Sequence, residues 1–433
     1  MSDLVALQSA VASRDAVVCV VGLGYVGLPV ALTFARAGFR VIGVDVDEER
    51  LGRIRSGINP IEGGEEPGLS ELLAESIETG RLEVTGDQRR VGDADIVTIN
   101  VQTPVGSDQS PNTDALVAAS RSIGTHMSRG TLVIVESTVA PGSTMGLVRP
   151  LLEEESGLEE GESFFVGSCP ERVMPGRLLA NIQSVPRVCG GSTPEVAETM
   201  RQLYATVVEA DLDTASTTTA ELVKVVENTY RDVQIAFANE VALICADLGE
   251  DVWRVRELVN KVPFRQMHYP GGGVGGHCIP KDPWLLAKAS TRDLKLIPAA
   301  REVNDGMPAE IARIAKASSD QLVEAGASLQ RARRVLILGY AYLAESDDAR
   351  NSPSAALTAE LASMGLEVVV HDPFVPGFQG DIDEMAASSG TVITMVHHGA
   401  YRDLDLPTSF HIDAQRLADA RARLSENHGV LNA

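Results

Sequence analysis

The sequence has few lysines and an excess of negative charge. Its 37 basic residues face 60 acidic ones, which gives a formal net charge of −23. Six of the 37 are lysines, and the first lysine is Lys224. Because proteins that bind nucleic acids or anionic membranes usually carry a basic surface, we expect neither partner. The composition is typical of a salt-adapted or a high-GC proteome and does not separate the two.

The cysteines lack the spacing of a disulfide framework or of a zinc site. They are widely separated and include no C-x-x-C motif, so neither arrangement is expected and no metal is predicted. A reducing cytoplasm is the expected location of such a chain. The five are Cys19, Cys169, Cys189, Cys245 and Cys278.

A secretory leader and a membrane span are also lacking. The N-terminal residues carry an acid at Asp3 and no basic segment, unlike a signal peptide. Residues 16–35 have no charge, but they contain Gly22, Gly24 and Pro29. These residues favour a strand, a tight turn and the start of a helix over a membrane helix.

The chain is long enough to require several domains. It shows no internal repeat, and 433 residues exceed what one hydrophobic core organises, so we expect two or three domains. Apolar, β-branched runs alternate with helical patterns in the N-terminal half, which indicates a parallel sheet covered on both faces. Strands are expected at 16–21, 39–45, 93–101, 131–137, 164–168 and 184–191.

A long helix is predicted from Thr218 to Leu248. Apolar residues recur there with helical spacing, Thr218 and Glu221 match a capping box, and Gly249 can end the helix. Its alanines would permit close packing on another helix, such as that of a second copy of the chain. A second α/β unit follows, with strands expected at 333–342, 366–373 and 391–398 and a helix at 354–364.

The sequence therefore predicts an α/β protein. Two doubly wound, Rossmann-like domains are joined by a long central helix and a small helical domain. The expected boundaries are 1–205 for a dinucleotide-binding domain, 206–320 for the helical domain and 321–433 for the second α/β domain.

Gly22, Gly24 and Gly27 form a G-x-G-x-x-G motif that follows one expected strand and opens a helix. Asp45 ends the next strand, eighteen residues after Gly27. The glycines let backbone amides approach a pyrophosphate, and the acid can accept a hydrogen bond from a ribose 2′-hydroxyl while repelling a 2′-phosphate. The pattern predicts NAD as the cofactor; the alternative is a glycine-rich turn without a ligand.

Hydroxyl side chains follow two further expected strands. Thr103 comes after the strand that ends at Val101, and Ser137 and Thr138 follow the next strand. Doubly wound sheets bind ligands at the carboxyl ends of their strands. Ordinary turn chemistry explains each hydroxyl equally well.

A glycine-rich segment ends in a cysteine. Five of the six residues 271–276 are glycine, and His277 and Cys278 follow. A substrate can approach such an open backbone closely. Helix-end amides at Asp282-Pro283 and a nearby cation would favour the nucleophilic thiolate. The alternatives are a buried structural thiol for Cys278 and a simple helix cap for Asp282.

Glu221, Lys224, Asn228 and Arg231 share one face of the long helix, at spacings of three, four and three. A buried lysine can release a proton near neutral pH, and Asn228 could donate a hydrogen bond to a developing oxyanion. From the residues alone, a solvated helix face is the simpler interpretation.

Seven segments, in order, resemble the UDP-glucose/GDP-mannose dehydrogenase family over nearly the whole chain. They are GLGYVGLP (22–29), QTP (102–104), EST (136–138), SCPERVMPG (168–176), TAELVKVVENTYRDVQIAFANE (219–240), GGGVGGHCIPKDPW (271–284) and DDARNSP (347–353). Several of them are most similar to the members that act on UDP-N-acetyl-D-mannosamine. Glucose-specific members usually carry a phenylalanine where this chain has Arg172.

The resemblance implies two oxidations of a sugar C6 alcohol, to an aldehyde and then to a carboxylate, with two NAD reduced. Cys278 would form a thiohemiacetal and then a thioester. Lys224 would act as acid and base at the C6 oxygen, and Asn228 would hold the oxyanion. The residues expected to assist hydrolysis of the thioester are Asp282, Glu171 and Thr138.

The resemblance also implies binding residues. The expected NAD contacts are Gly22, Gly24, Tyr25, Val26, Gly27, Asp45, Arg50, Thr103, Thr138 and Arg350. The expected UDP-sugar contacts are Arg172, Val173, Lys224, Asn228, Arg231, Gly273, Tyr342 and, from a neighbouring subunit, Arg265 and His268. A homodimer or a larger homo-oligomer is therefore expected.

The chain departs from the family at one point. The family usually has an aromatic residue and a lysine after the first strand of the third domain, and this chain has Tyr342 and Leu343. The lysine expected near the diphosphate is therefore missing. Arg416 is a candidate for a basic residue expected near the C-terminus.

Other functions on the same fold stay open. UDP-N-acetylglucosamine and UDP-glucose are alternative substrates. A non-catalytic sensor of nucleotide sugars would be expected to lose Cys278 or Lys224, and both are present. A one-step hydroxyacid dehydrogenase would not need the glycine-framed cysteine or a third α/β unit.

Overall fold

The chain divides into two compact units. The computed structural model describes residues 2–61, 66–106, 108–172, 176–402, 404, 406, 410–421 and 424. Unit 1 comprises Met1–Glu227 and Trp284–Thr291, and unit 2 comprises Asn228–Pro283 and Arg292–Ala433. The predicted division into three domains stays a prediction.

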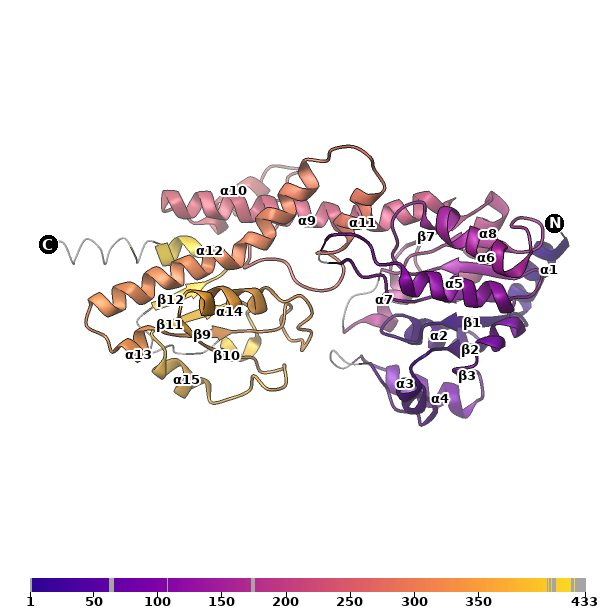
Figure 1. Ribbon diagram of the computed structural model, residues 1–433, viewed down its shortest axis with the longest axis horizontal. Coiled ribbons are helices and arrows are strands. Elements are labelled where there is room, and N and C mark those ends of the chain that lie inside the picture. The colour runs from indigo at the N-terminus through magenta and orange to yellow at the C-terminus, as the bar shows by residue number, and fades with distance from the viewer. Residues whose placement is uncertain are drawn as a thin grey trace. The chain divides into compact units, whose positions relative to one another are not determined.

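Unit 1 is built around an eight-stranded sheet with helices on both faces, as Figure 1 shows. The strand order is β3-β2-β1-β4-β5-β6-β7-β8, and only β6 and β7 pair antiparallel among these strands. Since β1 lies between β2 and β4, the strand order reverses direction at β1, where doubly wound sheets bind ligands. The strands are β1 (Val17–Val21), β2 (Arg40–Val44), β3 (Leu82–Thr85), β4 (Ile96–Ile99), β5 (Leu132–Val135), β6 (Phe165–Ser168), β7 (Arg187–Gly191) and β8 (Leu212–Ser216).

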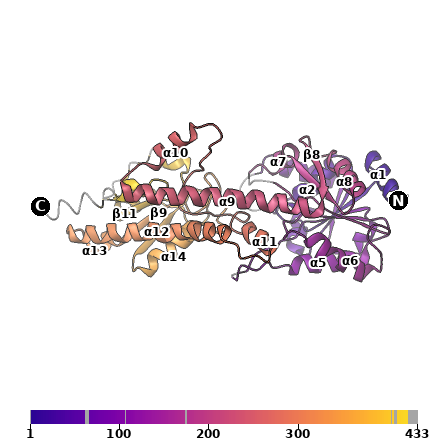
Figure 2. The ribbon, with the colours of Figure 1, turned by 90° about the horizontal axis from the view of Figure 1, so that it is seen from above.

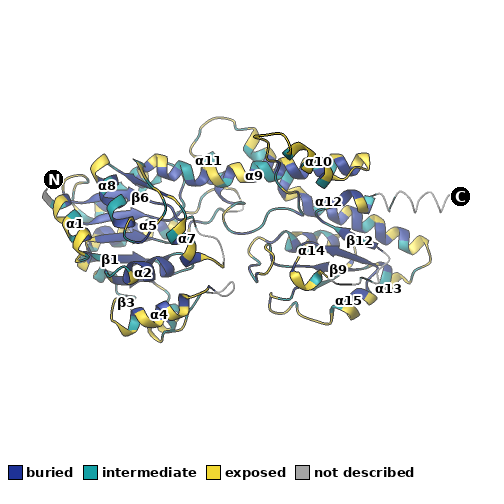
Figure 3. Cartoon of the chain, turned by 180° about the vertical axis from the view of Figure 1, so that it is seen from behind, coloured by how far each residue is buried: buried dark blue, intermediate teal, exposed yellow. Residues whose placement is uncertain are grey.

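Alternate side chains of the strands β1, β2, β4, β5 and β6 enter two separate cores. Val18 and Val20 of β1 pack with α1, α2 and α8 on one face, whereas Cys19 and Val21 pack with α5 and α6 on the other. Figure 3 shows these strands as buried between helices with exposed outer faces. The helices of unit 1 are α1 (Ser2–Ser13), α2 (Gly27–Arg36), α3 (Glu48–Arg55), α4 (Leu69–Glu78), α5 (Asp114–His126), α6 (Arg149–Ser156), α7 (Leu178–Ser184) and α8 (Pro194–Tyr204), with short helical turns η1 (Gln88–Asp93) and η2 (Thr144–Val148).

The predicted α/β fold class is confirmed. The six strands predicted for unit 1 correspond to β1, β2, β4, β5, β6 and β7. The sequence did not predict β3 and β8. β8 is an edge strand whose side chains are mostly exposed, so it lacks the continuous apolar run of a buried strand.

A single long helix, α9 (Thr217–Leu248), has 32 residues and runs from unit 1 into unit 2 (Figure 2). Its predicted capping box is wrong. The Glu221 carboxylate instead accepts hydrogen bonds from the backbone amides of Gly142 (2.5 Å) and Thr144 (2.8 Å). The hydroxyl of Ser216 accepts a hydrogen bond from the Thr219 amide at 3.2 Å. Burial raises the pKa of Glu221.

Unit 2 contains a four-stranded parallel sheet in the order β10-β9-β11-β12. Val335 and Ile337 of β9 pack with α12 and α14, and Leu336 and Leu338 face α15. β12 was not predicted, because its polar His411 and Asp413 alternate with its two apolar residues in a four-residue strand. The elements of unit 2 are β9 (Arg334–Leu338), β10 (Glu367–His371), β11 (Thr391–Thr394), β12 (Phe410–Asp413), α10 (Val252–Asn260), α12 (Leu296–Glu324), α13 (Leu329–Ala332), α14 (Pro353–Ser363), α15 (Ile382–Ser388) and the turn η3 (Gly399–Tyr401). A short helix, α11 (Asp282–Lys288), begins in unit 2.

A buried polar network joins α9 to α12 within unit 2. Arg301 Nη1 lies 2.6 Å from Asp232 Oδ1, and both side chains are nearly inaccessible to solvent. Asn304 donates to the same carboxylate oxygen at 2.8 Å, and its own oxygen accepts from Asn239 at 2.9 Å. A buried charge is tolerated only when it is paired and hydrogen-bonded, so these groups fix the register of the two helices.

Arg301→Ala should destabilise unit 2 strongly. The substitution leaves the Asp232 carboxylate buried without its cation, which typically costs about 3–5 kcal/mol. Urea unfolding followed by Trp253 fluorescence, in unit 2, measures the change. Lys316→Ala is the matched control on α12, because its pair with Asp320 is solvent-exposed and such pairs contribute about 0–1 kcal/mol. Equal losses in the two variants would contradict the assignment.

Candidate active site

The glycine turn after β1 has the geometry of a dinucleotide site. Gly22 has a φ of +92°, and a β-carbon there would lie 2.8 Å from the carbonyl oxygen of Asn100. A β-carbon at Gly27 would lie 1.8 Å from the carbonyl oxygen of Gly22. At Gly24 a β-carbon would meet nothing within 4 Å among the described residues. The outer glycines are thus required for the turn, and the middle one leaves the backbone open to a pyrophosphate at the start of α2.

Asp45 is attached directly to this turn. One carboxylate oxygen accepts a hydrogen bond from the Leu23 amide at 2.7 Å, and the other accepts from the Asp47 amide at 2.9 Å. Arg50 Nη1 lies 3.1 Å from Asp45 Oδ2. The structure therefore brings Asp45 and Arg50 together at the end of β2, where a ribose hydroxyl is expected.

Two predicted residues meet beyond β4 and β5. The Thr103 hydroxyl donates a hydrogen bond to the Thr138 carbonyl at 2.6 Å. Ser137, by contrast, donates to the Val101 carbonyl at 2.7 Å, which is turn chemistry. Val26 lies partly buried immediately before α2.

Glu66 connects the glycine turn to the segment that follows the predicted sugar contacts. Its carboxylate accepts a hydrogen bond from the Tyr25 hydroxyl at 3.1 Å. It also accepts from the backbone amides of Gly176 (2.6 Å) and Leu178 (2.9 Å). Sequence reasoning did not single out Glu66, since the contact joins positions more than a hundred residues apart.

Glu171 is buried in an ion pair that the sequence did not predict. Its carboxylate contacts the guanidinium of Arg187, and its Oε1 accepts a hydrogen bond from the Arg172 amide at 2.9 Å. Arg187 also lies 3.6 Å from Glu136, and burial raises the pKa of Glu136. An arginine that opens an otherwise apolar buried strand was the available signal, because such a charge requires a carboxylate partner.

Arg172, a predicted sugar contact of unit 1, lies against α9. Arg172 Nε is 3.2 Å from a carboxylate oxygen of Glu227, and Arg172 Nη1 donates to the Pro186 carbonyl at 2.9 Å. Lys224 is only 8% exposed, and within the described part of the chain its ammonium forms no ion pair. Val173 lies outside the described residues.

In unit 2 the structure brings Cys278, Asp282 and Asn228 together. Asp282 is fully buried, and its Oδ2 accepts a hydrogen bond from Asn228 Nδ2 at 2.5 Å. Lys281 Nζ lies 3.0 Å from the other carboxylate oxygen, and the Asp282 amide donates to the Cys278 carbonyl at 2.9 Å. The alternative of a simple helix cap is therefore wrong, since Asp282 is the first residue of α11 and its side chain contacts Asn228 and Lys281.

Cys278 is exposed, whereas the other four cysteines are buried, and all five are free thiols. The alternative of a buried structural thiol is thus wrong for Cys278. The expected reducing compartment stays a prediction.

The glycines before Cys278 are required mainly by packing. A β-carbon at Gly275 would lie 2.3 Å from Tyr342 Cβ, and one at Gly276 would lie 2.9 Å from the ring of Tyr342. Gly273 has a φ of +123° and faces Pro353. Within this glycine run, among the described residues, a β-carbon would find open space only at Gly271. The expectation of a backbone left open for substrate is therefore corrected to a backbone closely packed on its neighbours.

Several other predicted contacts lie in unit 2. Burial raises the pKa of Tyr342 to about 12, and its hydroxyl is hydrogen-bonded to Asp348, which also pairs with Arg350. Burial lowers the pKa of His268, which lies near Arg231. The remaining positions, all with exposed or partly exposed side chains, are Arg265, Leu343 and Arg416.

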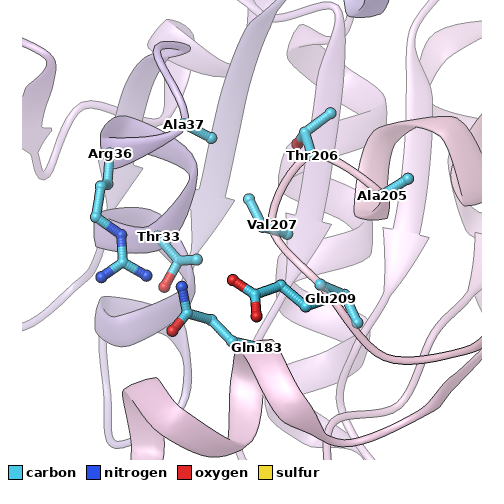
Figure 4. Close-up of a pocket in the computed structure, with 9 residues that line it drawn as sticks. Thr33, Arg36, Ala37, Gln183, Ala205, Thr206, Val207 and Glu209 are labelled. Atoms are coloured by element: carbon cyan, nitrogen blue, oxygen red, sulfur yellow. The ribbon is translucent and has the colours of Figure 1, made fainter.

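One surface pocket of unit 1 lies away from these residues. It has a volume of about 210 Å³, and Figure 4 shows Thr33, Arg36, Gln183 and Glu209 around it. Thr33 and Arg36 belong to the C-terminal end of α2, opposite the end that meets the glycine turn. None of the predicted site residues lines this pocket.

Comparisons with known proteins agree with this geometry. Three domain models match in order: the NAD binding domain of the UDP-glucose/GDP-mannose dehydrogenase family at 16–208, its central domain at 218–306 and its UDP binding domain at 336–425. UDP-N-acetyl-D-mannosamine dehydrogenase of Pyrococcus horikoshii is 37% identical over 389 residues, which are 90% of this chain and 91% of that protein.

Two solved structures show the same similarity. The structure of UDP-D-ManNAc dehydrogenase from Pyrococcus horikoshii has a TM-score of 0.86 and 35% identity, and the match covers 93% of this chain and 96% of that chain. The NDP-N-acetyl-D-galactosaminuronic acid dehydrogenase from Methanosarcina mazei Go1 has a TM-score of 0.80 and 34% identity, covering 97% and 91% of the two chains.

The fold, the glycine turn and Asp45 define an NAD-dependent dehydrogenase. The chain belongs to the UDP-glucose/GDP-mannose dehydrogenase family. The predictions of an oxidoreductase and of NAD as its cofactor are confirmed. Among the helices described here, none combines the length and the hydropathy needed to cross a membrane.

Asp45→Asn should shift the cofactor preference toward NADP. The amide cannot repel a 2′-phosphate, and it releases the neighbouring Arg50 to bind one. The ratio of kcat/KM for NAD to that for NADP should fall roughly tenfold or more, which corresponds to about 1.4 kcal/mol. Asp47→Asn is the control. Asp47 also contacts Arg50, but it accepts a hydrogen bond from the Arg50 amide and not from an amide of the glycine turn. An unchanged ratio in Asp45→Asn would show that this carboxylate does not face the ribose.

Proposed function

We propose that the chain oxidises C6 of UDP-N-acetyl-D-mannosamine to a carboxylate, in two NAD-dependent steps. The alternative substrates are UDP-N-acetylglucosamine and UDP-glucose. The observation that carries the proposal is the exposed Cys278, whose following turn links Asp282 to Asn228 of α9. The names of similar proteins support the sugar but do not fix it, since one of them acts on an N-acetylgalactosamine derivative by its name.

The first oxidation needs a base at the C6 hydroxyl. Lys224 is proposed to accept the hydroxyl proton while the C6 hydride departs. Its burial without an ion pair among the described residues supports this role, because no described carboxylate occupies the amino group that would contact the C6 hydroxyl. NAD, held by the glycine turn and Asp45, would supply the hydride acceptor for both oxidations.

The second oxidation needs a covalent bond to Cys278. The thiolate adds to the aldehyde carbon, and the carbonyl electron pair moves to oxygen. Asn228 has two amide hydrogens and uses one for Asp282, so the other is available to this oxyanion. Loss of the second hydride gives a thioester, and attack by water breaks the C–S bond and restores the thiol.

The hydrolytic step is proposed to involve Asp282, Glu171 and Thr138. Asp282 pairs with Lys281 and orients Asn228, so it can hold the attacking water close to the thioester. Glu171 is paired with Arg187, so its carboxylate is already engaged by a cation. An electrostatic contribution from Glu171 is therefore favoured over proton abstraction.

The oligomeric state is proposed to be a homodimer or a larger homo-oligomer. From Tyr230 to its C-terminal end, α9 exposes a stripe of large apolar side chains at helical spacing, and an exposed apolar stripe of this kind favours association. Its members, with their exposed fractions, are Tyr230 (63%), Phe237 (59%), Ile244 (51%) and Leu248 (72%).

Phe237→Glu should therefore give a monomer. A charge in the middle of the stripe would be desolvated on association, which costs several kcal/mol. Light scattering at working concentration measures the mass. Val5→Glu is the control, since Val5 is equally exposed (59%) but lies on α1. A monomeric wild-type protein would refute the proposed assembly.

Cys278→Ala tests the catalytic proposal. Wild-type protein should form two NADH per UDP-sugar, and the variant should lose net turnover by a factor on the order of 10³ or more, because the nucleophile is absent. A panel of UDP-sugars with NADH absorbance as the readout identifies the substrate. Cys245→Ala is the control, a buried cysteine of α9.

Two outcomes would contradict the proposal. One NADH per sugar with wild-type protein would remove the second oxidation. Ligand-shifted melting without NADH formation across the whole panel would instead indicate a nucleotide-sugar sensor.

A further inference from the structure

The residue two positions before Cys278 is held through both of its backbone polar groups. The Gly276 amide donates to the Arg350 carbonyl at 2.9 Å. The Gly276 carbonyl accepts a hydrogen bond from Asn351 Nδ2 at 3.1 Å. Arg350 and Asn351, two consecutive residues of the loop between β9 and α14, therefore both form hydrogen bonds to Gly276.

Asn351 is suited to this contact by its backbone. Its φ is +49°, in the left-handed region, which asparagine enters more easily than most residues with a β-carbon. The position is fixed from the C-terminal side, because the Ser352 side chain caps α14 by accepting from the Ser354 amide at 3.0 Å. The backbone of Asn351 is thus fixed by the capped start of α14, and its side-chain amide binds Gly276 from this position.

Tyr342 of the same loop and Pro353, the first residue of α14, support the glycine segment sterically. Pro353 would lie 3.1 Å from a β-carbon at Gly273 and 3.0 Å from one at Gly275. Tyr342 lies against both Gly275 and Gly276, 2.3 Å and 2.9 Å from β-carbons placed there. The glycine segment therefore has little room to shift relative to residues 342–353.

Cys278 is also held from its C-terminal side. Its carbonyl accepts hydrogen bonds from the Lys281 amide at 3.1 Å and the Asp282 amide at 2.9 Å. Asp282 is itself fixed by Asn228. Only His277 separates the turn of Cys278 from the Gly276 contacts, so the two fixed points leave Cys278 little freedom.

We propose that Asn351 is a positioning residue for Cys278, acting through its hydrogen bond to Gly276. The inference rests on the proposed role of Cys278 as the nucleophile. A covalent step requires the sulfur near its attack distance, and a displacement of about 1 Å can cost up to 100-fold in rate. The side-chain amide, rather than the left-handed backbone alone, is the operative group.

Three substitutions separate the amide from the backbone. Asn351→Asp keeps the shape but replaces the donor with an acceptor that faces a carbonyl. Asn351→Gly keeps the left-handed backbone and removes the amide. Asn351→Ala removes the amide and adds strain, because a β-carbon other than that of asparagine or aspartate is disfavoured at this φ.

The expected result is the same in Asn351→Asp and Asn351→Gly. kcat should fall roughly tenfold or more while KM for NAD stays within about twofold, because a displaced nucleophile slows chemistry without touching the cofactor turn. The rate of alkylation of Cys278 by iodoacetamide, followed by mass spectrometry, should change about threefold or more. Cys278 is a clean reporter, because the other four cysteines are buried.

Arg14→Ala is the matched control. Arg14 has a φ of +68° and its side chain also donates to a backbone carbonyl, that of Val11, at 2.9 Å. The control carries the same kind of strain and the same kind of lost hydrogen bond in unit 1, at the end of α1. It should lower the melting temperature without changing kcat or the alkylation of Cys278.

Two results would overturn the inference. Wild-type kcat and alkylation in Asn351→Gly would show that the amide is dispensable. A lower kcat with unchanged alkylation in all three variants would show that Asn351 acts elsewhere. Failure of the proposed function is a separate result, two NADH per sugar in Cys278→Ala, and it leaves the alkylation rates interpretable.

Discussion

The loop from Gly271 to Asp282, which carries Cys278, is held at both ends by asparagine side chains of one helix. Asn239 Oδ1 accepts a hydrogen bond from the Gly271 amide at 2.8 Å, where the glycine segment begins. Asn228 donates to Asp282, where the loop ends. The two asparagines are eleven residues apart on α9, about 16 Å along the helix axis. The helix fixes the spacing of the two asparagines, and Asp232, Arg301 and Asn304 hold α9 against α12. Both ends of the loop are therefore bound at fixed points.

In a chain this acidic, a buried cation is expected to have a carboxylate partner, so a buried cation without one indicates another role. Arg187 pairs with Glu171, Arg301 with Asp232 and Lys281 with Asp282, so each of these three buried cations has a carboxylate partner. Lys224 departs from this pattern, since no described carboxylate pairs with its ammonium. A stability requirement explains the paired cations, and it does not explain Lys224. Among the buried cations of the described residues, Lys224 is the one without a carboxylate partner, which is consistent with the role proposed for it at the substrate.

The sequence predicted what local patterns encode. The turn at Gly22 and the acid at Asp45 follow from glycines, strands and spacing within one βαβ unit, and the structure connects them through the Leu23 amide. β8 escaped prediction because an exposed edge strand has no apolar run. Contacts between distant segments were beyond reach, as with Glu221, whose spacing matched a capping box but whose carboxylate binds amides 77 and 79 residues away. The role of Asn351 likewise needs a φ value and a neighbour 75 residues distant.

Glu66 has a thermodynamic consequence for the affinities of the two proposed ligands. It serves at once the Tyr25 hydroxyl of the cofactor turn and the amides of Gly176 and Leu178, next to the segment assigned to the sugar. A cofactor that broke the hydrogen bond between Tyr25 and Glu66 would change the hydrogen bonds that the Glu66 carboxylate accepts from these two amides. By linkage, the change in the free energy of sugar binding that the cofactor causes through this carboxylate equals the change in the free energy of cofactor binding that the sugar causes. If the proposed sugar contacts hold, binding of the cofactor and binding of the sugar would be coupled equilibria, and Glu66 would contribute to that coupling.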